Sequence, residues 1–226
     1  MPCADRGEAV ALDGEAQQGD ARIDGNLLQM LTSLAEPFDI DDVRYVADAL
    51  PRAQADHALN ALIAETPWRQ DHALIFGRRV ALPRLTAWYG DPGAGYSYSG
   101  ISMAPTPWTS LLTELKAHSE TLAQAPFNSA LLNYYRDGRD SVGWHADAEP
   151  ELGRNPVIAS WSFGVTRRFE FRPRPPASGP VRAIELAHGS CLIMAGAVQH
   201  LWHHRLPRAA RVNEPRVNVT FRRIVP

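Results

Sequence analysis

The chain has 226 residues, a length that suits one domain, and its hydrophobic content of 45% is ordinary for a globular protein. Its two cysteines are too few for a disulfide framework, which excludes the disulfide-rich secreted classes and favours a reducing compartment. No apolar run approaches the roughly 18–20 residues of a membrane span, and residues 1–6 do not resemble a signal sequence. We therefore expect a cytoplasmic protein without a membrane partner.

The formal net charge of −2 is unevenly distributed along the chain. Residues 1–50 contain eleven acidic residues and three arginines, for a net charge of −8, whereas residues 51–226 contain twenty basic and fourteen acidic residues, for +6. A body with this charge permits nucleic-acid binding without requiring it. All basic residues except Lys116 are arginine, a bias that a GC-rich genome would also produce.

In chain order, residues 1–36 form an acidic segment whose composition predicts flexibility, with one short helix expected near residues 27–34. Pro51 begins a predicted helix over residues 51–65, with apolar residues at helical spacing. Thr106 and Pro107 are the predicted cap and first turn of a second helix. Its buried stripe is expected to be Leu111, Leu112, Leu115 and Leu122. Residues 82–104, between the helices, have the pattern of turns and a hairpin.

After Pro126 the chain consists of short apolar runs bounded by Gly, Pro and Asp, which predict strands. The predicted strands cover residues 129–136, 157–163, 168–172, 181–186, 191–194 and 217–224. Several short strands with regular breaks favour a β-sandwich or jelly roll. Helices followed by strands predict an α+β fold with its chemistry in the β part.

Trp144-His145-Ala146-Asp147 and, further along, His203-His204 could supply ligands to one metal ion. Residues i and i+2 of a strand project to the same face, so His145 and Asp147 could bind one cation. Two imidazoles and one carboxylate leave coordination positions open, as Fe(II) oxygenases require, whereas zinc sites favour closed sets of nitrogen and sulfur ligands.

The pattern around His145 also has simpler interpretations. Asp147 could cap a turn, and His145 could be an ordinary surface histidine. The third ligand stays open among His200, His203 and His204, because consecutive strand residues point to opposite faces and at most one of the last two can face the metal.

Arg216, Asn218, Thr220 and Arg222 share one face of a predicted strand near the C-terminus. Two buried arginines would be costly without an anionic partner, and guanidinium groups match carboxylates bidentately. The face therefore suits a dicarboxylate, although a solvated face of an edge strand would have the same pattern.

Several motifs together resemble the AlkB family of Fe(II)- and 2-oxoglutarate-dependent nucleic-acid dealkylases. They are Asn133-Tyr134-Tyr135-Arg136-Asp137-Gly138, Trp144-His145-Ala146-Asp147-Ala148-Glu149, Ile158-Ala159-Ser160-Trp161-Ser162-Phe163-Gly164, His204-Arg205-Leu206-Pro207 and Pro215-Arg216-Val217-Asn218-Val219-Thr220-Phe221-Arg222. The resemblance extends upstream through residues 83–90 to about Phe38, so it covers roughly five-sixths of the chain. Within the family, the chain is most similar to the branch of animal AlkB homologues that repair alkylated DNA.

The resemblance implies a double-stranded β-helix, or jelly roll, with supporting helices and an N-terminal substrate-binding lid. Residues 37–226 would form this domain, with helices and lid in residues 37–125 and the catalytic jelly roll in residues 126–226. The positions that match the family's iron ligands are His145, Asp147 and His204. Those that match its 2-oxoglutarate shell are Asn133, Tyr135, Arg216, Asn218 and Arg222. The resemblance does not decide which of the two arginines binds which carboxylate. His203 departs from the family, where an aromatic residue is usual.

The activity implied by the resemblance is oxidative removal of N-alkyl lesions, of the 1-methyladenine and 3-methylcytosine type, from DNA. RNA is a candidate second substrate. O₂ and 2-oxoglutarate would be consumed, and succinate, CO₂ and formaldehyde released. The target base would be single-stranded or flipped out of a duplex, and a monomer is expected. The alternative is a 2-oxoglutarate-dependent oxygenase that acts on a protein, lipid or small molecule.

Five residues are candidates for substrate binding. Trp88, Tyr96 and Tyr98 could stack on a flipped base, although Trp88 could equally be a core residue. Glu149 matches an acidic position that contacts the damaged base in relatives, and a carboxylate would favour cationic lesions; a capping role is the alternative. Arg84 is a candidate phosphate contact, or else a solvated surface arginine.

Overall fold

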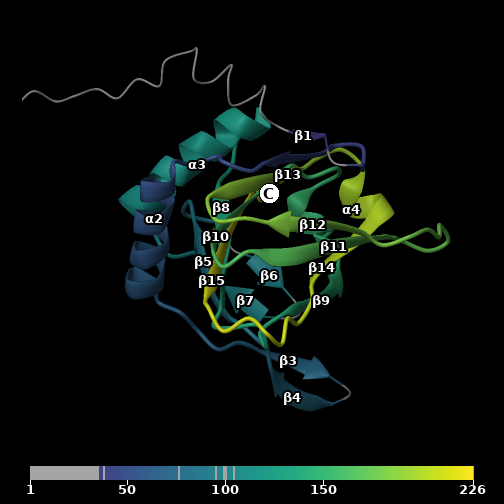
Figure 1. Cartoon of the computed structure of the whole chain (residues 1–226), viewed down its shortest axis with the longest axis horizontal. Helices are drawn as coiled ribbons and strands as arrows, with labels where there is room; N and C mark the ends of the chain where they lie inside the picture. The colour runs from purple at the N-terminus through teal and green to yellow at the C-terminus, as the bar shows by residue number, and fades with distance from the viewer. Residues whose placement is uncertain are drawn as a thin grey trace, which may run out of the picture.

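The computed structural model of the chain describes residues 36–37, 39–75, 77–94, 96–98, 101–103 and 105–225. The short helix expected near residues 27–34, and all but the last residue of the expected flexible segment, lie outside this part. The described residues form two larger β-sheets, with helices α2 (Arg52–Glu65) and α3 (Ser110–Ala123) beside the first of them (Figure 1).

The first sheet has seven strands in the order β1-β2-β13-β10-β15-β8-β5, and every neighbouring pair is antiparallel. The strands are β1 (Glu36–Pro37), β2 (Val43–Val46), β5 (Leu85–Gly90), β8 (Ser129–Tyr135), β10 (Ile158–Gly164), β13 (Ser190–Met194) and β15 (Arg216–Arg222). Strands β1, β2 and β5 precede residue 126, so both halves of the chain build this sheet.

The second sheet has four strands in the order β12-β11-β14-β9. They are β9 (Val142–His145), β11 (Arg167–Pro173), β12 (Arg182–Leu186) and β14 (Trp202–Leu206). Phe171 and Leu186 of this sheet pack in one buried cluster with Ile158 and Leu192 of the first sheet. The two sheets therefore face each other across a core, and the expected jelly roll with supporting helices is confirmed.

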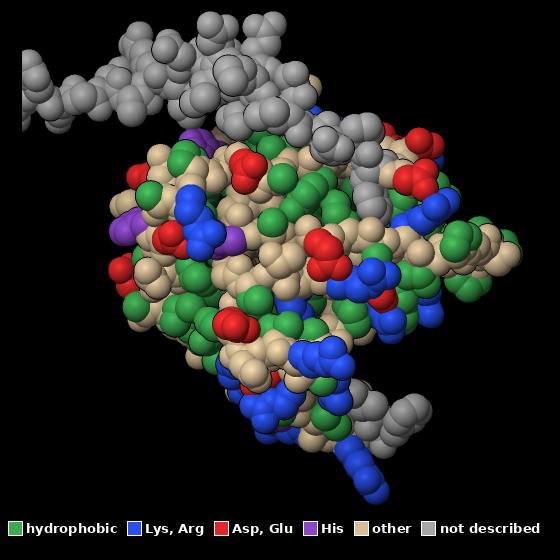
Figure 2. Space-filling view, viewed as in Figure 1, with side chains coloured by type: hydrophobic (Ala, Val, Ile, Leu, Met, Phe, Trp, Pro, Cys, Tyr) green, Lys and Arg blue, Asp and Glu red, His purple; other side chains and the backbone are tan. Residues whose placement is uncertain are grey.

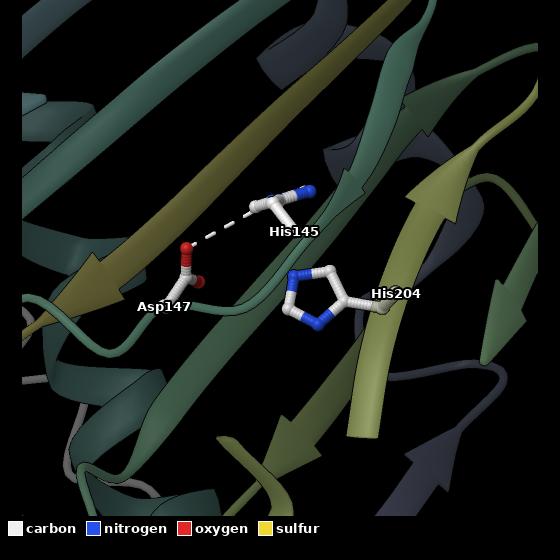
Figure 3. Close-up of side chains that lie close together, drawn as sticks. All are labelled: His145, Asp147 and His204. Atoms are coloured by element: carbon white, nitrogen blue, oxygen red, sulfur yellow. Dashed lines mark ion pairs between the residues drawn. The ribbon is translucent and has the colours of Figure 1, made fainter. Parts of the chain in front are cut away.

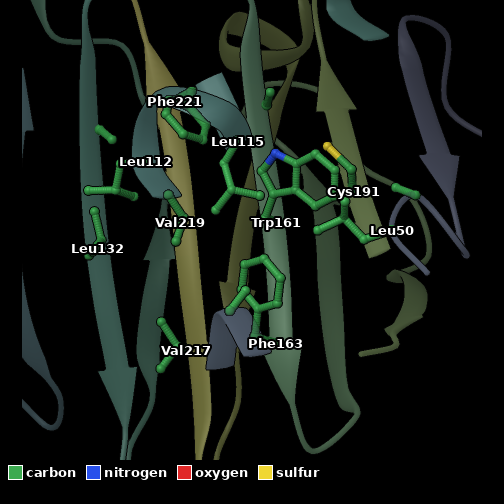
Figure 4. Close-up of a cluster of buried hydrophobic side chains, with 14 of the residues drawn as sticks. Leu50, Leu112, Leu115, Leu132, Trp161, Phe163, Cys191, Val217, Val219 and Phe221 are labelled. Carbon is green, nitrogen blue, oxygen red and sulfur yellow. The ribbon is translucent and has the colours of Figure 1, made fainter. Parts of the chain in front are cut away.

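Helices α2 and α3 cover the opposite face of the first sheet. Along β10, Trp161 and Phe163 point to these helices and pack with Leu112 and Leu115 of α3 (Figure 4). The indole Nε1 of Trp161 donates a hydrogen bond of 2.7 Å to Oγ of Ser119, so the polar atom of this buried ring is satisfied. The alternate residues of β10 consequently face the second sheet.

Strand β15 follows the same alternation. Val217, Val219 and Phe221 belong to the helix-facing core, so the polar residues between them face the second sheet. Strand β15 lies between β10 and β8, and each of its residues is buried. The polar face at the C-terminus is thus an internal wall, which excludes the interpretation as a solvated edge strand.

The first predicted helix is confirmed as α2, but the second begins later than expected, at Ser110. Thr109 is its cap, and its side chain accepts a hydrogen bond from the backbone N of Leu112 at 3.2 Å. Thr106 lies four residues before the helix, in a bridge beside β5 where its backbone N donates to the carbonyl of Trp88. Of the predicted buried stripe, Leu112, Leu115 and Leu122 are buried, whereas Leu111 is only partly buried against the same core.

Smaller elements complete the described residues. The expected hairpin is present as β6 (Tyr96–Tyr98) and β7 (Ile101–Met103), but residues 85–90, read as turns, form strand β5. A second hairpin, β3 (His72–Ile75) and β4 (Arg78–Ala81), projects from the body (Figure 1). The short helix α4 (Val198–Leu201) precedes β14. Among the described residues, no helix has the length and apolar character needed to cross a membrane.

Candidate metal centre

A polar cavity lies between the two sheets, with walls from β8, β10 and β15 on one side and β9, β11 and β14 on the other. All the residues that the sequence analysis expected to hold Fe(II) or 2-oxoglutarate line it: Asn133, Tyr135, His145, Asp147, His204, Arg216, Asn218 and Arg222. They come from four strands, β8, β9, β14 and β15, and from the irregular segment after β9, so the tertiary fold brings the predicted groups into one site.

His145, Asp147 and His204 each offer one ligand atom, and these atoms all lie within 4.8 Å of one another (Figure 3). This spacing is close to that of donors that share one cation about 2 Å from each of them. Among the residues that the structure describes, no other group of three His, Cys, Asp or Glu side chains has this arrangement.

Strand pairing aligns the two imidazoles. His145 is the last residue of β9 and lies directly opposite His204 of β14, with ring centroids 4.3 Å apart. His203 precedes His204 on the strand, so its side chain points to the other face of the sheet. Neither His200 nor His203 belongs to the cluster, so the histidine in it is His204, the one that the family resemblance implied where spacing alone left three candidates.

Asp147 does not lie on the same strand as His145, although the sequence pattern predicts that it does. Strand β9 ends at His145, so Asp147 lies in an irregular segment and its placement is not explained by strand alternation. Its Oδ2 accepts a hydrogen bond of 3.0 Å from Nη2 of Arg222, on the opposite wall. Its Oδ1 is buried without a hydrogen-bond partner and lies 3.9 Å from Nε2 of His145. One carboxylate oxygen is therefore left facing the cluster.

Burial and charge set the protonation of the cluster. Burial lowers the pKa of His204 to about 3, and the neighbouring His145 acts in the same direction. Burial also lowers the pKa of His145, although Asp147 opposes the shift. Burial alone would raise the pKa of Asp147, but Arg222 and the two imidazoles outweigh it and lower that pKa. Two neutral imidazoles and one carboxylate are the protonation states in which these groups bind metals.

Arg216 lies at the end of β15 opposite to Arg222, in register with Tyr135 of β8. Its guanidinium carbon is 5.3 Å from the centroid of the Tyr135 ring, and its Nη2 donates to Oγ of Ser162 at 2.8 Å. The side chain is buried, and no acidic group of the described residues forms an ion pair with it. A buried guanidinium group without an acidic partner favours the binding of an anionic ligand in the cavity.

The amides between the two arginines form a connected network. Nδ2 of Asn133 donates to Oδ1 of Asn218 at 3.4 Å, and Nδ2 of Asn218 donates to Oγ of Ser160 at 2.8 Å. Arg84 joins this network because its Nε donates to Oδ1 of Asn133 at 2.8 Å. Arg84 is 4% exposed, which contradicts both a surface phosphate contact and a solvated arginine; it is part of the cavity wall.

The other substrate candidates lie in different surroundings. Trp88 is 3% exposed, packs with Leu131 and Ile224, and donates from Nε1 to the carbonyl of Ala94 at 2.9 Å. It is thus a core residue, which replaces the stacking role, because no face of its ring is open to a base. The side chains of Tyr96 and Tyr98 lie outside the described residues.

Glu149 follows Asp147 by two residues and is half-buried. It stands at the start of the short helix η1 (Pro150–Leu152), but its side chain makes no capping hydrogen bond. Its Oε2 is buried without a hydrogen-bond partner. The capping alternative is therefore wrong, and this oxygen of the carboxylate is left without a partner among the described residues.

Ser160 and Ser162 of β10, which accept hydrogen bonds from Asn218 and Arg216, were not predicted as site residues. The sequence pattern could have identified them, because these two serines alternate with large apolar residues in a strand that is otherwise fully apolar. Gln199, whose Oε1 accepts a hydrogen bond from the backbone N of Asp147, was not predicted either, and no local pattern would have pointed to it.

Comparisons with known proteins agree with this site. The family model described as the 2OG-Fe(II) oxygenase superfamily matches residues 42–222. The chain is 46% identical over 181 residues to the alpha-ketoglutarate-dependent dioxygenase alkB homolog 3 of Mus musculus and to that of Homo sapiens. It is 37% identical over 183 residues to the DNA oxidative demethylase ALKBH2 of Homo sapiens. The chain belongs to the AlkB family.

The extent of these matches differs among the AlkB relatives. Each alkB homolog 3 alignment covers 76% of this chain and 63% of the relative, so the chain spans less than two thirds of those proteins. The human ALKBH2 alignment covers 77% of this chain and 70% of the relative. The solved structure of OsALKBH1 has a TM-score of 0.57 at 19% identity and covers 83% of this chain and 100% of that one. That likeness concerns the fold alone.

AlkB membership implies Fe(II), 2-oxoglutarate and O₂, and the cavity fits this set. Two neutral imidazoles and a carboxylate with an unpaired Oδ1 match the donor set of non-haem Fe(II) oxygenases. The buried Arg216, which lacks an acidic partner, fits a co-substrate with a second carboxylate.

Proposed function

We propose that this AlkB-family protein is an oxidative dealkylase that removes N-alkyl lesions, of the 1-methyladenine and 3-methylcytosine type, from DNA, with RNA as a second substrate class. The observation that carries the proposal is the meeting of His145, Asp147 and His204 in one cavity with the buried, unpaired Arg216. The similarity to ALKBH2, a DNA oxidative demethylase, supports the choice of substrate.

In this proposal, His145, Asp147 and His204 hold Fe(II), and the 2-oxoglutarate shell consists of Asn133, Tyr135, Arg216, Asn218 and Arg222. Arg216 takes the carboxylate remote from the metal, because Arg222 already pairs with Asp147 at the metal end. When bound, Fe(II), 2-oxoglutarate and O₂ supply the oxidation of the N-alkyl carbon, with succinate, CO₂ and formaldehyde as products.

The chain's own residues orient these groups and exclude water. Nδ1 of His145 lies 2.9 Å from the carbonyl of Gly143, so Nδ1 carries the proton and Nε2 is left for the metal. His204 and Asp147 are each only 2% exposed, and Arg222 fixes Oδ2 of that carboxylate. Charges in such a buried site interact more strongly than they would in water.

The proposed substrate is a base that is single-stranded or flipped out of a duplex, because a stacked base cannot reach an interior site. Glu149 would contact the lesion, and its buried, unpartnered Oε2 would favour the cationic 1-methyladenine and 3-methylcytosine. Tyr98, and less directly Tyr96, remain the proposed stacking residues. Both belong to the β6-β7 hairpin, which we propose as part of the lid.

The distribution of basic side chains on the surface is consistent with a polyanionic partner. Figure 2 shows basic side chains gathered over the projecting β3-β4 hairpin, where Arg78 and Arg79 are exposed. Such groups contact phosphates without reading sequence. We further propose one catalytic domain over residues 37–226, with residues 37–125 supplying helices and lid, and a monomer that works in the cytoplasm.

The test is a panel of methylated DNA and RNA oligonucleotides incubated with Fe(II), 2-oxoglutarate and ascorbate, with substrate mass and formaldehyde as readouts. We expect each 1-methyladenine or 3-methylcytosine to lose the mass of one CH₂ group, because N–CH₃ becomes N–H, with one equivalent of formaldehyde released. His145→Ala and Asp147→Ala should abolish both signals while circular dichroism stays unchanged. His203→Ala is the matched control, because that imidazole faces away from the cluster, and it should keep the activity.

Turnover by His145→Ala or Asp147→Ala at the wild-type rate would contradict the metal assignment. Succinate formation by the wild type without mass loss from any oligonucleotide would instead retain the oxygenase chemistry and reject the nucleic-acid substrate. The protein, lipid or small-molecule alternative would then take its place.

A further inference from the structure

The backbone of Asp147 needs a partner that no strand provides. β9 ends at His145, so no ladder hydrogen bond holds the segment that carries the carboxylate. The backbone N of Asp147 donates instead to Oε1 of Gln199 over 2.9 Å, in a fully buried contact. A buried N–H without an acceptor would cost on the order of 1–3 kcal/mol, so this side chain has a defined role.

Gln199 is itself tightly placed. It lies in α4 and is 0% exposed. Its backbone carbonyl accepts 2.7 Å from Nη1 of Arg174, and its Nε2 lies 3.7 Å from Sδ of Met194. The Arg174 contact holds the main chain at Gln199, while the side-chain amide lies with its oxygen toward Asp147 and its nitrogen toward the thioether.

Helix α4 leads directly into β14, which carries His204. Gln199 therefore links the irregular segment that bears the carboxylate to the element that bears one of the two imidazoles. Arg222 fixes the carboxylate from the first sheet, but its contact is to Oδ2 and leaves the backbone of Asp147 unconstrained. The amide of Gln199 supplies that second constraint.

We propose that Gln199 is a positioning residue of the metal centre, which holds the Asp147 carboxylate at the separation from His204 that one metal ion requires. The inference rests on the proposed function, since it presumes that Asp147 and His204 bind the same ion. Gln199 does not touch the metal in this account. Partners of this kind around metal ligands typically contribute 10- to 100-fold to metal affinity.

The test uses the full chain and Mn(II), titrated in the absence of substrate and followed by electron paramagnetic resonance of the free ion. Gln199→Leu and Gln199→Met remove the acceptor while filling the space, and each should raise the Kd for Mn(II) by about 10-fold or more. Gln199→Glu keeps an acceptor oxygen and should stay within a few-fold of the wild type. His200→Ala, an exposed neighbour on the same short helix, is the matched control and should not change the Kd.

Thermal unfolding of the metal-free variants separates positioning from packing. An unchanged Kd in the Leu and Met variants, with or without a lower melting temperature, would overturn the inference, as would a Kd for Gln199→Glu as weak as theirs. If one apolar variant fails to fold, the other carries the comparison. Failure of the wild type to bind Mn(II) more tightly than His145→Ala would reject the proposed metal site itself.

Discussion

Nη2 of Arg222 donates to Oδ2 of Asp147 over 3.0 Å, and the two side chains are 5% and 2% exposed. The bond joins the last residue of β15 to the segment after β9, across the space between the sheets. It occupies one oxygen of the carboxylate and leaves Oδ1 facing the two imidazoles. The orientation of a proposed metal ligand is thus fixed by an arginine that also belongs to the proposed co-substrate shell.

Removal of that arginine should weaken metal binding. Arg222→Met leaves the Asp147 carboxylate without its charged partner, and we expect the Kd for Mn(II) to rise by about 10-fold or more. Arg222→Lys should be intermediate, because an ammonium group keeps the charge but loses the planar fork. Arg223→Met changes the exposed neighbour and is the control. Equal affinities for all three variants would refute the role given to the pair.

Arg216 should determine affinity for the co-substrate. Charged hydrogen bonds typically contribute about 1.5–3 kcal/mol, so Arg216→Met should raise the KM for 2-oxoglutarate by roughly 10- to 100-fold. Metal affinity should stay near that of the wild type, since Arg216 lies at the other end of β15. Succinate formation measured against 2-oxoglutarate concentration tests this, with the exposed Arg211→Met as control. A KM that does not move would place the remote carboxylate elsewhere.

The metal-free protein should lose stability as the pH falls. The pKa of His204 is about 3 in the folded state and 6.5 ordinarily, so between these values the unfolded chain binds more protons. The free energy of unfolding therefore does not depend on the protonation of this imidazole above about pH 6.5. Below that pH it decreases by on the order of 1 kcal/mol per pH unit for one imidazole. Melting temperatures recorded between pH 7.5 and pH 5 should show this decline.

The matched variant for the pH experiment is His204→Asn, whose side chain does not titrate. Its melting temperature should depend less steeply on pH over the same interval. His145, whose pKa is also lowered, keeps part of the slope in that variant. A slope as steep as that of the wild type would mean that His204 is not the group that resists protonation.

Glu149 should discriminate between lesions by charge. Glu149→Gln removes the charge from a carboxylate that has an unpartnered buried oxygen, with little change of shape. We expect a larger loss of kcat/KM on cationic 1-methyladenine and 3-methylcytosine than on the neutral lesion etheno-adenine. Glu151→Gln, on the adjacent short helix, is the control. Equal losses on both kinds of lesion would leave Glu149 with a structural role only.

Much of the fold was accessible from local patterns. The strands over residues 129–136, 157–163 and 191–194 are strongly apolar, and turn residues bound them, so their positions were predictable. Strand β5 was missed because Gly90 and the turn residues after it dominate the local pattern, whereas its pairing with β8 is a long-range contact. The cap of α3 moved from Thr106 to Thr109 for the same kind of reason, since the bridge to β5 occupies the backbone of Thr106.

The sequence by itself determined the chemistry of the site: two imidazoles, a carboxylate, and a strand face with two arginines that proved to be buried. Spacing left the third histidine open and the family resemblance implied His204, which lies in the cluster. Only the tertiary structure decided that Trp88 is core and that Arg84 lies in the cavity wall. Residue type and spacing report what a side chain can do and, within one strand, which face it shares. Whether two such faces meet depends on the pairing of strands far apart in the chain, here β9 with β14 and β8 with β15, which no local pattern encodes.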